Sequence, residues 1–319
     1  MALGDGIRRN LLDVPDSERQ LLRDAIAALN SHFYPGSKTD LPVPGGVSFW
    51  FKQDEIHQST HVHNCPAFLP WHREIVNRFE DLIRDVNSQL SLHYWDWTKD
   101  PAPLFTPEFM GSANGLAGQF WRDSGFYNPD TAEDRDTTLN PADPPKEIIR
   151  QVGVSAPLVL PREDRAALGA PDFPEFNRLI NILHAAMHSY IGGPGGTLTD
   201  PHQSFRDPFV FLLHSNVDRL FAMWQRDPAH PERLDPARVY GAWGNTTGSG
   251  DVTSEHPKWG ILSPLEPWSG PDAQTSATGV ITNVVKTRPW CAPEKLASFK
   301  DSLDPSIVTP RSYDTALAP

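Results

Sequence analysis

The histidines of this chain are concentrated in two short segments. Five of the 12 lie within 37 residues and four lie within 31 residues, in a chain of 319. The first group is His57, His61, His63, His72 and His93, and the second is His184, His188, His202 and His214. An even spread would place far fewer histidines in these positions, so the two segments form either two polar sites or one shared site.

Hydrophobic periodicity predicts that several of these histidines lie on the buried faces of helices. Residues 69–86 have the spacing of an amphipathic helix, in which one face carries His72, Val76, Phe79, Ile83 and Val86. A second predicted helix spans residues 176–191 and carries His184 and His188 one turn apart. A third spans residues 210–225, with His214 on its apolar side. The three helices therefore direct imidazoles into the core.

A metal site explains these imidazoles better than coincidence. A single buried histidine is usually a hydrogen-bonded core residue. Several together must each lose hydration and find partners, and a metal ion removes both costs by binding the neutral ring nitrogen. His184 and His188, at positions i and i+4, can hold one ion together. Imidazole ligands without cysteine pairs or carboxylates favour copper, since a paired-metal hydrolase usually also needs a bridging Asp or Glu.

Three motifs carry a resemblance to a known family. They are the run from His63 to Arg73 (HNCPAFLPWHR), the block from Tyr94 to Trp97 (YWDW) and the run from Asp207 to Leu220 (DPFVFLLHSNVDRL). Together with the HxxxH pair on the second helix, they resemble the tyrosinase family of type-3 copper proteins over about residues 40–230. That family includes catechol oxidases and haemocyanin-like oxygen carriers. With the predicted helices, the resemblance implies a mainly α fold, in which a four-helix core holds a dinuclear copper site. Long Pro/Gly-rich loops and a few short strands are expected around this core.

The resemblance also implies the metal ligands, with two copper ions as cofactors. His63 and His72 match the second and third ligands of the first copper, and the ligands of the second are matched by His184, His188 and His214. The first ligand of the first copper is either His57 or His61. We prefer His57, because it leaves six residues for the chain to turn back to His63, whereas His61 lies only two residues away.

Other residues are expected to support the ligands. Asp218 lies one turn after His214 and is expected to accept the free ring N–H of a ligand, while Arg73 and Asp96 brace the same core. Membership of an ordinary buried ion pair is the alternative for each. At Cys65 a free buried thiol is favoured over a disulfide with Cys291.

Three positions bear on the choice of substrate. Family members that hydroxylate phenols place an Asn just after the first ligand of the second copper and a nearby Glu that fixes a basic water. The first of these positions is Ala185 here, and the nearest upstream carboxylate is Glu175. Glu175 is also suited to compensating the dipole at a helix start, and Asn181 is an alternative for orienting the water.

The predicted function is the copper-dependent oxidation of phenolic substrates with O2, the activity of a tyrosinase or catechol oxidase. We expect strong oxidation of ortho-diphenols or ortho-aminophenols to quinones and weaker action on monophenols, because Ala185 departs from the pattern of the hydroxylating members. A haemocyanin-like oxygen carrier is the first alternative. A zinc hydrolase is the second, prompted by the close pair His61 and His63.

Composition restricts the partners and the domain organisation. A net charge of -12 argues against nucleic acid as a partner, and no run of about 18 apolar residues predicts a membrane span. The first ten residues lack the apolar run of a secretion signal, so a cytoplasmic location is expected. Residues 1–319 are predicted to form one domain, with the copper core at about 40–230 and a segment at about 231–319 that frames or covers the site. Whether the chain forms a homo-oligomer is left open.

Overall fold

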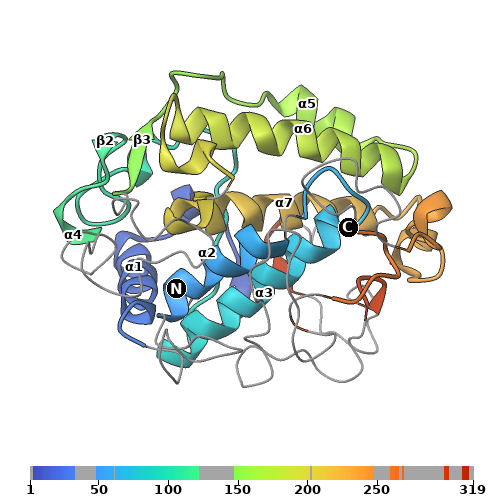
Figure 1. The fold of residues 1–319 in the computed structure, drawn as a ribbon, viewed down its shortest axis with the longest axis horizontal. Coiled ribbons are helices and arrows are strands. Elements are labelled where there is room, and N and C mark those ends of the chain that lie inside the picture. The colour runs from blue at the N-terminus through green and yellow to red at the C-terminus, as the bar shows by residue number, and fades with distance from the viewer. Residues whose placement is uncertain are drawn as a thin grey trace.

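Four helices form the centre of the molecule, as Figure 1 shows. They are α2 (Phe49–Thr60), α3 (Phe68–Val86), α6 (Phe173–Gly192) and α7 (Phe209–Gln225). In the figure α7 lies between α6 on one side and α2 with α3 on the other, and α7 packs against both α3 and α6. The predicted mainly α class and the three helices expected from periodicity are confirmed.

This computed structural model describes residues 3–32, 48–60, 62–121, 147–201, 203–247, 259–265, 268, 298–301 and 311–315. The remaining helices are α1 (Asp16–Leu29), α4 (Gln119–Trp121) and α5 (Pro161–Leu168). The short 3-10 helices are η1 (Leu11–Asp13), η2 (Ala102–Leu104), η5 (Thr197–Thr199), η6 (Ser204–Arg206), η7 (Pro231–Leu234) and η8 (Gly241–Trp243). The strands are β1 (Ile7–Arg8), β2 (Asn114–Leu116), β3 (Ile149–Gln151) and β4 (Ser312–Tyr313). No helix in these ranges is both long and apolar enough to cross a membrane.

Aromatic side chains hold the central helices together. Phe79 of α3 stacks on Phe211 of α7 with ring centroids 3.5 Å apart, and Trp50 of α2 meets both rings edge-on at 5.8 and 5.9 Å. All three side chains are fully or almost fully buried. Val86, at the end of the predicted apolar stripe, is 37% exposed, so the buried face of α3 ends at Ile83.

Local signals explain where α6 begins and ends. The side chain of Asp172 accepts the backbone N–H of Glu175 at 3.0 Å, and Pro174 occupies the first turn, where a missing N–H costs nothing. At the other end Gly193 adopts a φ of 67°, a conformation that favours glycine.

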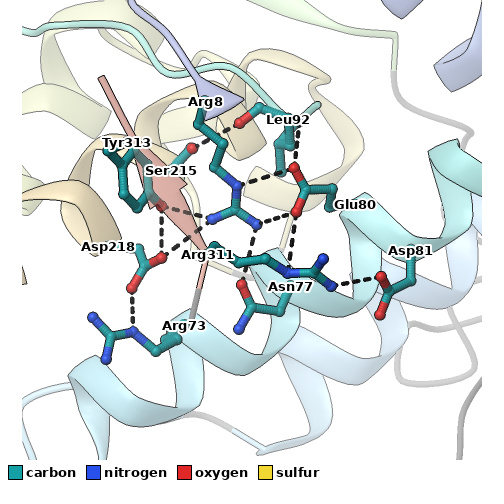
Figure 2. A network of polar contacts seen from close by, with 10 residues as sticks. All are labelled: Arg8, Arg73, Asn77, Glu80, Asp81, Leu92, Ser215, Asp218, Arg311 and Tyr313. Atoms are coloured by element: carbon teal, nitrogen blue, oxygen red, sulfur yellow. Dashed lines mark hydrogen bonds and ion pairs between the residues drawn. The ribbon is translucent and has the colours of Figure 1, made fainter. Parts of the chain in front are cut away.

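The two ends of the described chain meet on α3 and α7. Strand β1 pairs in parallel with β4, with Arg8 opposite Tyr313. Arg8 is fully buried and donates through both Nε and Nη2 to Glu80 of α3, at 3.2 and 2.8 Å. Its Nη1 donates to Asp218 of α7 at 3.2 Å and to the hydroxyl of Tyr313 at 2.6 Å (Figure 2). One guanidinium thus joins both terminal strands to two central helices.

Further cations complete this network. Arg73 donates to Asp218, and Arg311 reaches Glu80 at 3.2 Å and Asp81 at 2.6 Å (Figure 2). Burial alone would raise the pKa of Glu80, but the adjacent Arg8 holds it below its usual value. Burial would likewise raise the pKa of Asp218, but the charges of Arg73 and Arg8 outweigh this effect and lower it. Both carboxylates are therefore ionised inside the protein.

The non-periodic, proline-rich sequence of residues 100–172 predicts a loop, and this prediction is wrong in part. The described residues of this range include β2, the antiparallel partner β3, and the two-turn helix α5. Pro161 begins α5 at a position where proline is tolerated, and Glu163 accepts the N–H of Leu160 at 2.7 Å. The proline content that suggested a loop marks a helix start here.

Helix α5 also carries a buried carboxyl group. Asp164 accepts the indole N–H of Trp97 at 2.7 Å, and burial raises the pKa of Asp164 to about 6. The folded protein therefore holds this proton more tightly than the unfolded chain does. The contribution of Asp164 to stability is fully present below about pH 4 and is lost as the pH rises through about 6.

We expect Asp164→Asn to stabilise the protein at pH 8 by up to about 3 kcal/mol, because the amide keeps the acceptor for Trp97 without a buried charge. The gain should vanish near pH 4, where the wild-type carboxyl is neutral. Thermal unfolding of both proteins at the two pH values measures it. Asp24→Asn, which changes an exposed carboxylate on α1, is the control, and an equal gain at both pH values would contradict the prediction.

Candidate metal centre

The first group of histidines comes from two helices and the segment between them. His57 lies near the end of α2, His72 in the first turns of α3, and His63 in the connection. The Nε2 atoms of His57 and His63 are 3.2 Å apart, and the ring centroid of His72 lies 5.9 Å from that of His57 and 5.3 Å from that of His63. One nitrogen from each ring fits within a 4.8 Å cluster.

The second group is formed by α6 and α7. His184 and His188 lie one turn apart on α6, and His214 approaches both from α7. The Nε2 of His214 is 3.2 Å from that of His184 and 3.1 Å from that of His188. In the described part of the chain these two triads are the only clusters of three or more metal-ligating side chains, and neither includes a carboxylate.

Hydrogen bonds fix the ring tautomer of one histidine in each triad. The Nδ1 of His72 lies 2.8 Å from the carbonyl oxygen of Phe68, and the Nδ1 of His188 lies 2.8 Å from that of Leu198. A carbonyl oxygen only accepts, so both Nδ1 atoms carry the proton and both Nε2 atoms present a lone pair to their triad. The Nε2 of His72 is buried and has no hydrogen-bond partner among the described residues.

A metal ion fits these lone pairs. Two imidazole nitrogens that lie 3.1–3.2 Å apart, as in the pairs His184–His214 and His188–His214, subtend an angle of about 100° at an ion about 2.0–2.1 Å from each, which is close to tetrahedral. Burial lowers the pKa of His72, His184 and His214 well below the usual value and that of His188 to about 4. These four rings are therefore neutral at pH 7, which is the form that binds metal.

The two triads face each other. The rings of His72 and His214 stack with centroids 4.6 Å apart, and those of His63 and His184 lie 6.1 Å apart at an angle of 20°. Phe68 contacts rings of both triads, at 4.6 Å from His72 and 5.0 Å from His184. The histidines of the two sequence segments thus form one shared site made of two facing triads.

Neighbouring residues orient individual rings. Phe205 of η6 stacks on His57 at 4.1 Å, while Arg206 pairs with Asp54, one turn before His57 on α2, at 2.8 Å. Sequence reasoning missed Phe205 of η6 and the carbonyl oxygen of Leu198 on η5, since no spacing rule brings either element against a histidine. It also missed the carbonyl oxygen of Phe68, which lies four residues before His72 on α3 and could have been found from the i, i+4 spacing of a helix.

The glycine turn Gly192–Gly196 places the carbonyl that binds His188. Gly196 lies so close to the end of α6 that a Cβ there would be 1.9 Å from the oxygen of Gly192. Only glycine allows this approach, which returns the chain to Leu198 beside His188. The glycine-rich sequence of residues 192–196 also predicts that this turn lies at the mouth of the site, and this stays a prediction.

Two residues expected to support the ligands have other contacts. Asp218 accepts from Arg73, Arg8 and Tyr313, and none of its hydrogen-bond donors among the described residues is a histidine. Arg73 also donates to Gln225 at 2.6 Å. Both residues belong to a buried ion pair, which was the alternative. The ring N–H groups of His72 and His188 donate to backbone carbonyl oxygens and not to Asp218. The side chain of Asp96 accepts the N–H and the hydroxyl of Thr98 within its own turn, and the backbone N–H of Asp96 donates to Asn10 at 3.3 Å.

The expected substrate-side residues do not converge on a water site. Glu175 lies at the surface at the start of α6, where it pairs with Arg178 at 2.6 Å, and this contact lowers its pKa. Asn181 donates to the carbonyl of Asn177 at 2.8 Å and accepts the N–H of Asn64 at 3.4 Å. Ala185 is exposed. Both ends of the Asn181 amide are thus used within the protein.

The six residues of the triads include neither the other histidines of the two sequence groups nor the two cysteines. His93 is outside both triads, where it accepts the N–H of Arg9 at 3.0 Å and donates to Glu18 at 2.9 Å. His61, the alternative first ligand, and His202 lie outside the described residues. Cys65 is a free buried thiol whose pKa is raised by burial to about 12, whereas Cys291 is outside the described residues.

Part of the segment after residue 230 packs near the start of α3. Trp268 lies 5.4 Å from Trp71 and under the guanidinium of Arg78 at 4.9 Å, and the carbonyl of Trp259 accepts the N–H of Ala67 at 3.3 Å. These contacts surround the residues that precede His72. The predicted covering of the site stays a prediction. The sequence also predicts a short helix near residues 294–302, and this range falls mostly outside the described residues.

Comparison with known proteins agrees with this geometry. The model of a family described as the common central domain of tyrosinase matches residues 47–227. A tyrosinase of Streptomyces lincolnensis is 32% identical over 191 residues, which cover 55% of this chain and 68% of the relative. Grixazone synthase of Streptomyces griseus is 30% identical over 273 residues, or 72% of this chain and 87% of the relative. A functional unit of Octopus hemocyanin has the same fold, with a TM-score of 0.57 at 19% identity over 97% of this chain and 68% of that one.

Proposed function

Because this chain belongs to the tyrosinase family, we propose that it oxidises ortho-diphenols to ortho-quinones with O2 at a pair of copper ions, one held by each histidine triad. The first ion would be bound by His57, His63 and His72, and the second by His184, His188 and His214. The family match supports the type of centre, and the site supports its position in this chain.

One observation carries the proposal. Two all-imidazole triads face each other, and the rings of His72 and His214 stack between them with centroids 4.6 Å apart. When bound, a pair of copper ions supplies the exchange of electrons with O2. Two molecules of ortho-diphenol each give up two electrons and two protons, and one O2 takes up all four of each and leaves as two molecules of water.

The protein itself would position the metal and exclude water. The carbonyl oxygens of Phe68 and Leu198 hold the protons of His72 and His188 on Nδ1, so that each Nε2 is available to metal. Phe68 and Phe205, both fully buried, cover rings of the two triads. These contacts provide a dry and rigid frame, which is the protein's share in chemistry that the cofactor carries.

Ortho-diphenols or ortho-aminophenols are proposed as better substrates than monophenols. Hydroxylation of a monophenol requires a base for a proton whose pKa is about 10. The α6 residues expected to supply one are engaged elsewhere: Glu175 pairs with Arg178, Asn181 binds Asn64 and Asn177, and Ala185 has no polar group. Their engagement supports the ranking.

Quinone formation tests the proposal. Protein loaded with copper is expected to oxidise catechol and 2-aminophenol rapidly and phenol slowly, with two copper ions per chain. The apoprotein and the zinc-loaded protein are the controls. Full zinc occupancy with hydrolytic activity and no oxidation would support the hydrolase instead. Equal rates on catechol and phenol would contradict the substrate ranking.

A reversible oxygen carrier is the second candidate. The similarity of the fold to a functional unit of Octopus hemocyanin favours it. The same copper-loaded protein would then bind O2 reversibly and turn over neither catechol nor 2-aminophenol. Measuring O2 uptake with and without catechol distinguishes the two functions.

A further inference from the structure

Two asparagines on α6 hold the segment that follows His63. Asn177 donates through Nδ2 to the carbonyl of Cys65 at 3.3 Å, and Asn181 accepts the N–H of Asn64 through Oδ1 at 3.4 Å. The two asparagines are one turn apart, so both contacts lie on one side of the helix. Two consecutive residues of the His63 segment are therefore bound to α6.

The orientation of these amides is specified. Asn181 also donates through Nδ2 to the carbonyl of Asn177 at 2.8 Å, which turns its Oδ1 toward Asn64. Asn177 is 3% exposed, and its Oδ1 is buried with no hydrogen-bond partner among the described residues. A buried polar atom without a hydrogen bond lowers stability, and an apolar side chain at this position would avoid that loss. What the amide of Asn177 contributes is therefore the hydrogen bond from its Nδ2 atom.

The bound segment has an unusual backbone. Asn64 has a φ of 51°, the one positive value among the described residues other than glycine. Such a conformation is disfavoured for a side chain with a Cβ, although asparagine tolerates it better than most. Contacts from outside the segment are needed to maintain it, and the amide of Asn181 supplies one at this residue.

The contacts of Asn177 and Asn181 link the two triads. His63 immediately precedes the bound segment, and His184 follows Asn181 by three residues on the same helix. Their rings lie 6.1 Å apart at 20°. The asparagines thus connect a ligand of one triad directly to the helix that carries two ligands of the other.

We propose that Asn177 and Asn181 are positioning residues that set the separation of the two metal ions by holding the His63 segment against α6. The inference rests on the proposed copper pair. It assigns no metal contact to either asparagine, because each acts through the backbone that carries His63. Losing one contact should leave both triads able to bind copper and change how the two ions are placed relative to each other.

Alanine variants separate this role from a general effect on folding. Asn177→Ala and Asn181→Ala each remove one of these contacts. Alanine is the residue that favours the helix most, so α6 itself is not weakened. We expect both variants to bind two copper ions per chain, as the wild type does. Cupric ions a few ångströms apart couple their spins, so the wild type should show little paramagnetic resonance signal, and the variants should show a several-fold larger one.

A conservative variant tests the atom involved. Asn181→Asp keeps an oxygen that can accept the N–H of Asn64, so its resonance signal should stay as low as that of the wild type. Ile182→Ala, at an exposed neighbouring position on α6, is the control and should also leave the signal unchanged. Melting temperatures of the apoproteins report any loss of stability separately.

The outcomes are distinct. A low signal in both alanine variants at full copper occupancy would overturn the inference, as would Asn181→Asp behaving like Asn181→Ala. Loss of bound copper in the alanine variants would also overturn it, because the triads would then depend on the asparagines for binding and not for spacing. A wild-type protein that binds copper without spin coupling would instead contradict the proposed copper pair.

Discussion

His214→Asn is expected to reduce bound copper from two ions per chain to one and to lower the rate of quinone formation by more than about 100-fold. His214 is the one ligand of the second triad that comes from α7, and its Nε2 lies within 3.2 Å of both other nitrogens. Changes to groups that merely orient a metal ligand cost about 10–100-fold, so loss of the ligand itself should cost more. Metal analysis of the dialysed protein and the rate with catechol measure the effect.

A second buried histidine provides the matched control. His93 is as deeply buried as His214 but belongs to neither triad, since it joins Arg9 to Glu18. His93→Asn should lower the melting temperature while retaining two copper ions per chain. If His214→Asn kept two ions and full activity, the assignment of the second triad would be wrong.

Arg8→Met is expected to lower the free energy of unfolding by about 3–5 kcal/mol, because it removes the main counter-charge of the buried Glu80 and one of the two arginines that pair with the buried Asp218. Arg8 is fully buried, and it bridges Glu80 of α3 to Asp218 of α7 while also binding Tyr313 of β4 (Figure 2). Urea unfolding of the apoprotein measures the change without any contribution from metal.

Two further variants identify the cause. Arg9→Met removes an adjacent arginine whose pair with Asp5 is largely open to solvent, so it should cost no more than about 1 kcal/mol. Adding Glu80→Gln to Arg8→Met removes one of the buried carboxylates that Arg8→Met leaves without its partner. The double variant should therefore recover part of the lost free energy of unfolding. No recovery would mean that packing, and not the unpaired charge, accounts for the effect of Arg8→Met.

Much of the candidate site could be predicted from local patterns. The i, i+4 spacing of His184 and His188, and the apolar stripes around His72 and His214, are properties of a helix that any packing of that helix preserves. The same reasoning predicted α3, α6 and α7 to within a few residues. It was less successful between residues 100 and 172, because prolines occur both in loops and at the starts of helices such as α5.

The supporting residues could not be predicted in this way. Asp218 lies one turn from His214 along the sequence, which suggested a contact with a ligand, but its partners include Arg8, 210 positions away. Asn181 was expected near a water, but its oxygen accepts from Asn64, 117 positions away. Sequence spacing gives the direction of a side chain relative to its own helix and says nothing of what another segment brings to meet it.

The amino-acid sequence alone determined which histidines face inward, the α-helical class and the likeness to a copper protein, because a 3.6-residue period and short motifs depend only on neighbouring residues. Only the tertiary structure decided that the triads face each other, that carbonyl oxygens orient His72 and His188, and that Asp218 pairs with arginines. The stacking of His72 on His214 and the pairing of Asp218 with Arg8 join residues far apart in the chain, and such contacts form only when the helices pack and water is excluded from between them.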